Sequence, residues 1–445
     1  MLHWNRSCVA LLFSVFALAA GPCLAAENAG QAELDKATQM KVTASSAGDL
    51  SEVITLCEAA LEKGLDKGNT EFAKSILAAA CVDRGTIRAQ AGRADTALKD
   101  FDKAIEADPK NPLAYERKGL VLAAQKKYDE ALATLDKGAK ASPDLTTFPI
   151  QKARVYSAKS EPKSALEELI KALAIEPENI GVLLLRAGVY QELNERQKAL
   201  DDVDKVLQLK PETSAAARSR AMLLSELGKH EDALSELEKL HKAEPKDPVT
   251  LLQLGVLYSA YKKPAKAVEA FTALLKDHPG EWAAYRGRGD AELGLGRRLD
   301  AIRDYNRGLQ LQPKDPGILN NLAWVLATAP EKDLRDGQRA VVLATEACKV
   351  SNYQQSHILS TLAAAHAENG DFILAVEWAT KAVELGSKEH GEQLKKELES
   401  YKARKPWREN LPGDKKPEEK PALETKTEEK KTDDKKPEEK KAEQK

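Results

Sequence analysis

The apolar residues of this chain recur at helical spacing over most of its length. They stand three, four or seven positions apart with charged residues between them, which is typical of amphipathic helices that bury one face. The apolar stripes come in pairs, and a short polar turn separates the two members of each pair. The pattern therefore predicts an all-helical chain built from helical hairpins.

The hairpins repeat with a period of 34 residues. Seven prolines mark this period: Pro109, Pro143, Pro177, Pro211, Pro245, Pro279 and Pro313. Each proline follows the second helix of a hairpin, where a residue without a backbone N–H cannot continue the helical hydrogen bonds. A fixed period of this size predicts a solenoid whose units bury their apolar faces only against their neighbours.

Two small residues, twelve positions apart in every unit, predict where its helices cross. The pairs are Gly85 and Ala97, Gly119 and Ala131, Ala153 and Ala165, Ala187 and Ala199, Ala221 and Ala233, Gly255 and Ala267, and Gly289 and Ala301. A larger side chain would overpack such a crossing at a cost of roughly 1–3 kcal/mol. Several first helices also end on a residue that tolerates a left-handed backbone and so begins the turn. These residues are Gly92, Gly228, Gly296, Gly370 and Asn194.

These residues resemble the repeats of the tetratricopeptide repeat (TPR) family. The shared features are the period of 34, two helices per unit, small residues at positions 8 and 20, and proline at position 32. The resemblance, which extends to exported bacterial TPR proteins, implies an all-α, right-handed α-solenoid of helix-turn-helix repeats. Regular units are expected to begin near Ala78, Pro112, Thr146, Ile180, Ser214, Pro248 and Trp282. The shared positions are packing positions, so they specify the fold and leave the function open.

The repeat is disturbed at both ends of the array. Residues 26–67 are interpreted as an N-terminal helical segment that holds a divergent repeat, with about ten extra residues before the first regular unit. We assign the TPR array to residues 68–387; its last two units include about five extra residues in one turn, around 330–334. Residues 388–411 are expected to form a C-terminal capping helix, with Leu394, Leu398 and Tyr401 on its apolar face.

The two termini differ in composition from the array. Residues 1–25 predict a secretory signal peptide, because Arg6 precedes a run of roughly twelve apolar residues, fewer than the ~20 that span a bilayer. We therefore expect a periplasmic or extracellular protein; the alternative is an uncleaved N-terminus that anchors the chain in the membrane. Residues 412–445 carry eleven acidic and eleven basic residues and predict a disordered Lys/Glu/Pro tail. The tail could be a solubilising linker or a tether to a partner.

Composition excludes several kinds of site. Charged residues make up 31% of the chain, and the formal net charge is −2, which favours neither nucleic acid nor an anionic membrane surface as a partner. Beyond the signal peptide, the cysteines are Cys57, Cys81 and Cys348, which do not form a disulfide framework. Cys57 and Cys81 could pair, or both could be buried free thiols. No metal-binding motif is present, so we predict no metal and no cofactor.

Catalytic motifs are also missing from the sequence. It contains no Walker loop and no GxSxG motif, and the carboxylates are expected on solvated helix faces. His366 occupies a position that holds tyrosine in other units, where core packing is favoured over catalysis. We predict no catalytic residue and a protein that is not an enzyme.

The remaining candidate is the concave surface, which in the TPR family is lined by the first helices. Residues at equivalent positions of successive units stack side by side there. The candidate peptide-binding residues are Leu184, Gly188, Arg218, Met222, Leu252, Val256, Arg286 and Asp290. An extended or helical peptide would place apolar side chains on the middle units and an acidic group on Arg218 or Arg286. Alternatively, these residues pack within the solenoid; Trp324 could likewise be a groove anchor or pack against the inserted turn.

The function that follows is a non-enzymatic, protein- or peptide-binding scaffold or adaptor of the cell envelope, with no stable membrane span after signal cleavage. The alternative is an accessory or regulatory subunit of an envelope enzyme complex, recruited through the disordered tail. The sequence does not specify an oligomeric state.

Overall fold

The computed structural model describes residues 28–387 and 391–409, and within these ranges the fold is all-helical. The proposed signal peptide and the Lys/Glu/Pro tail lie outside the described residues. The chain divides into two compact units at residue 250, within helix α13. None of the described helices is both long enough and apolar enough to cross a membrane.

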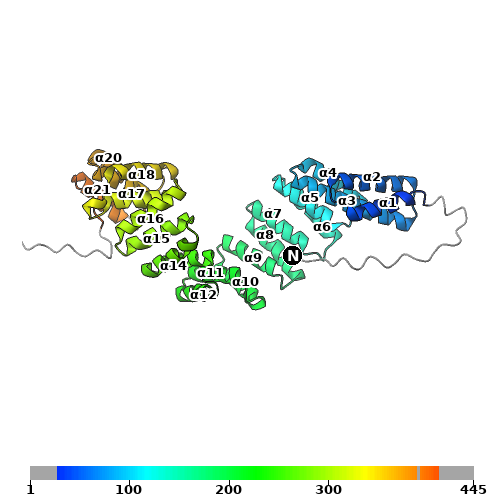
Figure 1. The fold of residues 1–445 in the computed structure, drawn as a ribbon, viewed down its shortest axis with the longest axis horizontal. Helices are drawn as coiled ribbons and strands as arrows, with labels where there is room; N and C mark the ends of the chain where they lie inside the picture. Colours follow the sequence, from blue (N-terminus) through cyan, green and yellow to red (C-terminus); the bar gives the residue numbers. More distant parts are fainter. Residues whose placement is uncertain (1–27, 388–390, 410–445) are drawn as a thin grey trace, which may run out of the picture. The chain divides into compact units, whose positions relative to one another are not determined.

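In the unit that ends at residue 250, successive helices pair as antiparallel hairpins (Figure 1). Its helices are α1 (Gln31–Thr43), α2 (Ala47–Lys63), α3 (Lys67–Gln90), α4 (Ala94–Ala107), α5 (Pro112–Ala124), α6 (Tyr128–Ala141), α7 (Thr147–Ala158), α8 (Pro162–Ile175), α9 (Ile180–Glu192), α10 (Arg196–Leu209), α11 (Ser214–Glu226), α12 (His230–Ala243) and the start of α13 (Pro248–Ala260). The first helices of these repeats, α5, α7, α9, α11 and α13, begin at or within one residue of the expected unit starts. The TPR-like repeat register is therefore confirmed.

The unit that begins at residue 251 contains the last regular repeats and the disturbed ones. After α13 come α14 (Pro264–Asp277), α15 (Trp282–Gly294), α16 (Arg298–Leu311), α17 (Pro316–Thr328), the 3-10 helix η1 (Lys332–Leu334), α18 (Gly337–Val350), α19 (Ser356–Glu368), α20 (Phe372–Leu385) and α21 (Gly391–Lys402). The extra residues expected around 330–334 do lie in the turn between α17 and α18, and the last three of them form η1.

The extra residues at the N-terminal side of the array lengthen a helix. We expected the first regular unit to begin near Ala78, but α3 begins at Lys67 and runs for 24 residues. Asp66 accounts for this start, because its side chain accepts a hydrogen bond from the backbone N–H of Asn69 and so caps the helix. The insertion is thus helical rather than a separate connection between units.

The small residues at the helix crossings fit against large residues of the partner helix. A Cβ atom added at Gly85 would lie 2.7 Å from the ring of Phe101, and one at Gly289 would lie 2.7 Å from the ring of Tyr305. Where the partner is aliphatic, as Leu169 and Val203 are, alanine takes the place of glycine in most units. The helix crossing therefore limits the combined volume of the two residues, so a larger partner requires a smaller residue opposite it.

Every regular unit from α3 to α16 has a residue with a left-handed backbone at the end of its first helix. The expected residues adopt it, with φ of 74° at Gly92, 78° at Gly228, 75° at Gly296 and 62° at Asn194. Three units use other residues at the same place: Lys126 (φ 61°), Ser160 (φ 63°) and Lys262 (φ 56°). The turn geometry is thus imposed by the hairpin, even where the residue does not favour it.

The mismatch between residue and backbone at Lys126 leads to a stability prediction. Lys126→Gly should raise the free energy of unfolding by about 0.5–1 kcal/mol, because glycine adopts a positive φ without a Cβ clash. Gly92→Ala is the reverse control and should lower the free energy of unfolding, because alanine is strained at a positive φ. No atom lies within 4 Å of a Cβ added there, so the backbone strain is the only cost. Urea denaturation of both variants measures the changes; a destabilised Lys126→Gly would contradict the explanation.

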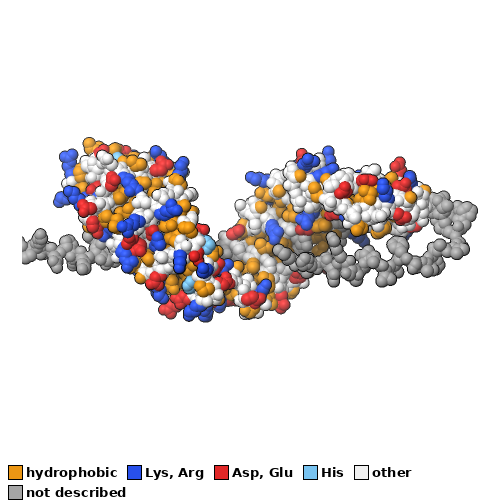
Figure 2. Space-filling view, viewed as in Figure 1, with side chains coloured by type: hydrophobic (Ala, Val, Ile, Leu, Met, Phe, Trp, Pro, Cys, Tyr) orange, Lys and Arg blue, Asp and Glu red, His pale blue; other side chains and the backbone are white. Residues whose placement is uncertain are grey.

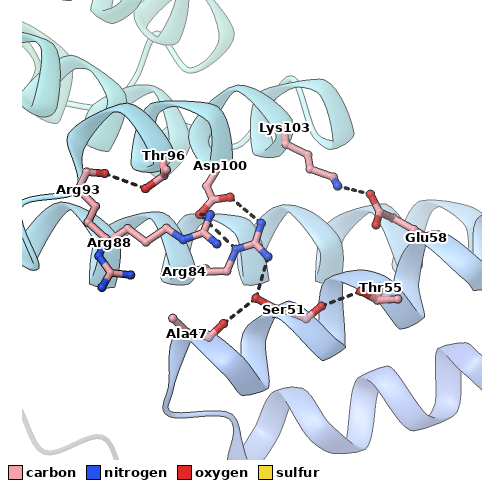
Figure 3. A network of polar contacts seen from close by, with 10 residues as sticks. All are labelled: Ala47, Ser51, Thr55, Glu58, Arg84, Arg88, Arg93, Thr96, Asp100 and Lys103. Atoms are coloured by element: carbon pink, nitrogen blue, oxygen red, sulfur yellow. Dashed lines mark hydrogen bonds and ion pairs between the residues drawn. The ribbon is translucent and has the colours of Figure 1, made fainter.

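Ion pairs within units correct one expectation about the carboxylates. We expected these side chains on solvated faces, but Asp100, Asp202 and Asp304 are 3%, 5% and 7% exposed. Each accepts hydrogen bonds from an arginine 16 residues earlier, on the first helix of the same unit: Arg84, Arg186 and Arg288. In Figure 3, Arg84 also reaches Ser51 of α2, so one guanidinium joins three helices. These carboxylates serve packing between helices, and their burial follows from their pairing.

The three cysteines in the described part of the chain are buried free thiols. Burial raises the pKa of Cys57 to about 11 and that of Cys81 to about 12. The pKa of Cys348 is likewise raised by burial, to about 11. All three therefore remain protonated and unreactive at neutral pH.

Candidate functional site

A cavity of about 460 Å³ opens on the first helices of the C-terminal repeats. Asp290 and Leu293 of α15, Asn320, Asn321 and Trp324 of α17, and Ser356, His357, Ser360 and Thr361 of α19 form one side of it. The other side is formed by Gln393, Leu394 and Glu397 of α21 and by Glu409. The cavity exists because α21 and the residues after it fold back across the first helices.

Helix α21 brings a buried carboxylate to the cavity wall. Glu397 is 2% exposed, and its oxygens accept hydrogen bonds from the hydroxyl of Ser360 and from Nε2 of Gln393. Burial raises the pKa of this carboxyl, and the two hydrogen bonds offset part of that effect. The apolar residues Leu394, Leu398 and Tyr401 of the same helix are buried against the last repeats.

Asp290 lies on the opposite wall. Its Oδ1 atom accepts hydrogen bonds from the hydroxyl of Tyr305, at 2.6 Å, and from Nδ2 of Asn321, at 2.8 Å. Desolvation by the surrounding protein raises the pKa of Asp290, although part of its side chain stays open to the cavity. The site therefore holds two carboxylates in surroundings that penalise their negative charge.

The segment after α21 lies along the ends of α17 and α19. The backbone N–H of Glu409 donates to the carbonyl of Thr328 at 3.1 Å, and the indole Nε1 of Trp324 donates to the Glu409 carboxylate. Arg408 donates to the carbonyl of Ala327 at 3.2 Å and pairs with Glu368. The structure thus places Trp324 in the cavity wall, beside the returning chain.

Smaller hollows lie between α7 and α9 in the N-terminal unit. Two adjacent ones, of about 380 and 310 Å³, share Arg154, Leu184 and Leu185 in their linings. Gly188 lines the second hollow, and a Cβ added there would have no atom within 4 Å. Of the candidate residues in this unit, Leu184 and Gly188 therefore share one open surface, whereas Met222 of α11 is half-buried outside these linings.

The two candidate arginines already have acidic partners. Arg218 lies 3.2 Å from Asp247, and Arg286 lies 3.4 Å from Asp315, in both cases 29 residues further along the chain. Each aspartate also accepts a hydrogen bond from a backbone N–H in the first turn of the following helix. These arginines hold successive units together, so recognition of an acidic peptide group would have to compete with an internal carboxylate. That role stays a prediction.

The remaining candidates belong to the C-terminal unit. Val256 of α13 is 47% exposed and Leu252 of the same helix is half-buried. Asp290 is the one candidate that lines the cavity; the sequence interpretation missed Asn320, Ser360, Glu397 and Glu409. Asn320 and Ser360 are the fifth residues of their units, so the repeat register could have placed them on the first-helix surface. The two glutamates could not, because their place depends on how the chain folds back after the last repeat.

Other chemistry is not supported by the described residues. They contain no group of three or more metal-ligating side chains. Burial lowers the pKa of the His366 imidazole, as expected of a packed side chain. On the face seen in Figure 2, lysine and arginine are interspersed with aspartate and glutamate, so neither sign dominates it.

Family comparisons agree with the repeat geometry. The family model described as "Tetratricopeptide repeat" matches residues 82–145, and that described as "Psidin, N-terminal TPR repeats region" matches residues 185–285. The chain is a tetratricopeptide repeat protein. TPR arrays are scaffolds typical of protein–protein interactions and are generally non-catalytic. No curated protein is detectably similar to this TPR protein in sequence.

Solved TPR structures are similar at low sequence identity. A TPR protein from Parabacteroides merdae is 21% identical with a TM-score of 0.43, over 54% of this chain and 95% of its own. Yeast Tom70 is 15% identical with a TM-score of 0.42, over 84% of this chain and 96% of its own. YrrB, described as a TPR protein with an unusual peptide-binding site, is 21% identical with a TM-score of 0.32, over 50% of this chain and 96% of its own.

Proposed function

We propose that this TPR protein is a non-enzymatic scaffold that binds a protein or peptide through the first-helix surfaces of its repeats. The observation that carries the proposal is the open surface between α7 and α9. Leu184 lines both hollows there, and Gly188 leaves the adjoining space unfilled. An accessible apolar side chain beside a gap on a rigid helix is suited to receive a side chain of a partner.

We further propose that the protein acts in the cell envelope as an adaptor, which rests on the N-terminal sequence pattern alone. An apolar run too short to span a bilayer, preceded by Arg6, favours a cleaved secretory signal peptide over an uncleaved membrane anchor. N-terminal sequencing of the protein purified from its native host tests this. A mature terminus near Ala26 is expected, and an intact Met1 would contradict cleavage and favour the membrane-anchored alternative.

The binding surface is tested by a charge introduced at its centre. Leu184→Asp should abolish recovery of the partner that is captured by the full wild-type chain, because a carboxylate would have to be desolvated at the contact. Leu209→Asp is the matched control: this leucine is 37% exposed at the end of α10, a second helix, and its replacement should leave recovery unchanged. Circular dichroism must show that both variants fold. Unchanged recovery by a folded Leu184→Asp variant would remove this surface from the proposal.

A further inference from the structure

The cavity of the C-terminal unit has a surplus of hydrogen-bond acceptors. Six lining side chains donate to groups of the protein itself: Asn320, Asn321, Trp324, Ser360, Thr361 and Gln393. By contrast, Oδ1 of Asn320 is buried and accepts no hydrogen bond from the described residues. Oδ2 of Asp290 and Oε1 of Glu409 likewise receive none from that part of the chain. A group that satisfies these three acceptor atoms must be a donor.

The charge of the lining is also unbalanced. Among its described residues are three carboxylates, those of Asp290, Glu397 and Glu409, and no lysine or arginine. The nearby cations are engaged elsewhere: Arg286 pairs with Asp315 and lies over the ring of Trp282, and Arg408 pairs with Glu368. A cation entering the cavity would therefore meet three carboxylates that form no ion pair with a lysine or arginine of the described residues, although Arg286 acts on Asp290 from a distance.

The apolar part of the lining suits the stem of a long side chain. Leu293 of α15, Leu394 of α21 and Trp324 of α17 all line the cavity, and the indole Nε1 of Trp324 donates to Glu409. Lysine and arginine bury their methylene stems against such surfaces while the charged head reaches polar groups, and an indole ring favours a cation at its face. A volume of about 460 Å³ is ample for one such side chain.

We propose that this cavity binds a lysine or arginine side chain presented by a partner protein. The charged head donates to Asp290, Asn320 and Glu409, and the stem packs between Leu293, Leu394 and Trp324. The inference deepens the proposed scaffold function, because it rests on that function and names the chemistry of one docking point. It assigns to the C-terminal unit a preference for basic segments.

The test uses the full chain and small probes of defined charge. Nα-acetyl-lysine N-methylamide is titrated at low salt and followed by saturation-transfer NMR, beside the norleucine analogue, which has the same stem without the charge. We expect the lysine probe to bind about tenfold more tightly, as one partly desolvated ion pair provides. Equal binding of the two probes would overturn the proposal. So would equally tight binding of glycinamide, because it would assign the site to a chain terminus rather than a side chain.

Variants place the binding in this cavity. Asp290→Asn and Glu409→Gln keep the shapes of the side chains and should each weaken the lysine probe several-fold, with no effect on the norleucine analogue. Glu399→Gln is the matched control, an exposed glutamate of α21 paired with Lys402, and should leave binding unchanged. Should Asp290→Asn fail to fold, Glu409→Gln decides the question. Unchanged lysine binding in a folded Glu409→Gln variant would overturn the assignment, while partner capture through Leu184 would remain intact.

Discussion

Replacing Asp100 by alanine should lower the free energy of unfolding of the N-terminal repeats by about 3 kcal/mol. Asp100 is 3% exposed and accepts hydrogen bonds from Arg84, at 2.6 and 3.2 Å, and from Arg88, at 2.8 Å (Figure 3). Its removal would leave two guanidinium groups facing each other without a counter-charge. The side chains of Arg84 and Arg88 are 13% and 27% exposed, so water partly screens their unpaired charges. The expected loss of stability is therefore near the lower end of the range for breaking a buried ion pair.

The control for this prediction is Asp102→Ala, two residues further along α4. Asp102 pairs with Lys118 at 2.5 Å, but its side chain is 57% exposed, so its removal should cost less than about 1 kcal/mol. Urea denaturation followed by circular dichroism measures both changes. Similar effects at the two positions would mean that burial of the Asp100 pair contributes nothing. Charge repulsion between Arg84 and Arg88 predicts in addition that Asp100→Ala regains stability at high salt.

The repeat period made much of the fold predictable, because each unit repeats the same packing problem. Gly85 and Phe101 occupy the same two places as Gly289 and Tyr305, six units later, so one register positions both pairs. The left-handed turns were predictable where glycine or asparagine stands. The left-handed turn at Lys126 was not predictable, because the hairpin imposes a positive φ that lysine does not favour.

The cavity was not predictable, because it depends on contacts between segments far apart in sequence. Trp324 and Glu409 are 85 residues apart, and Ser360 and Glu397 are 37 apart, whereas the repeat relates residues only within and between neighbouring units. The buried carboxylates were missed for a different reason. Asp202 looks like any helix-surface aspartate until Arg186, 16 residues earlier, is placed opposite it by the hairpin.

Packing at the helix crossings predicts a second large change in stability. Gly255→Ala should lower the free energy of unfolding of the C-terminal repeats by about 1–3 kcal/mol. A Cβ atom at Gly255 would lie 2.5 Å from the ring of Phe271. The ring is 1% exposed and cannot retreat, because a Cβ built at Gly287 on another helix would lie 2.4 Å from it. The expected clash outweighs the gain of roughly 1 kcal/mol that alanine brings to a helix interior.

The matched control is Gly188→Ala, which should be stabilising by up to about 1 kcal/mol. Gly188 also lies inside a first helix, but a Cβ there meets no atom within 4 Å, so only the gain in helix propensity remains. In a Phe271→Leu background the smaller side chain should make room, and Gly255→Ala should become neutral or stabilising. Thermal and urea unfolding of the four variants in this cycle measure the coupling. A Gly255→Ala effect that persists unchanged in the Phe271→Leu background would mean that the ring is not what confines this position to glycine.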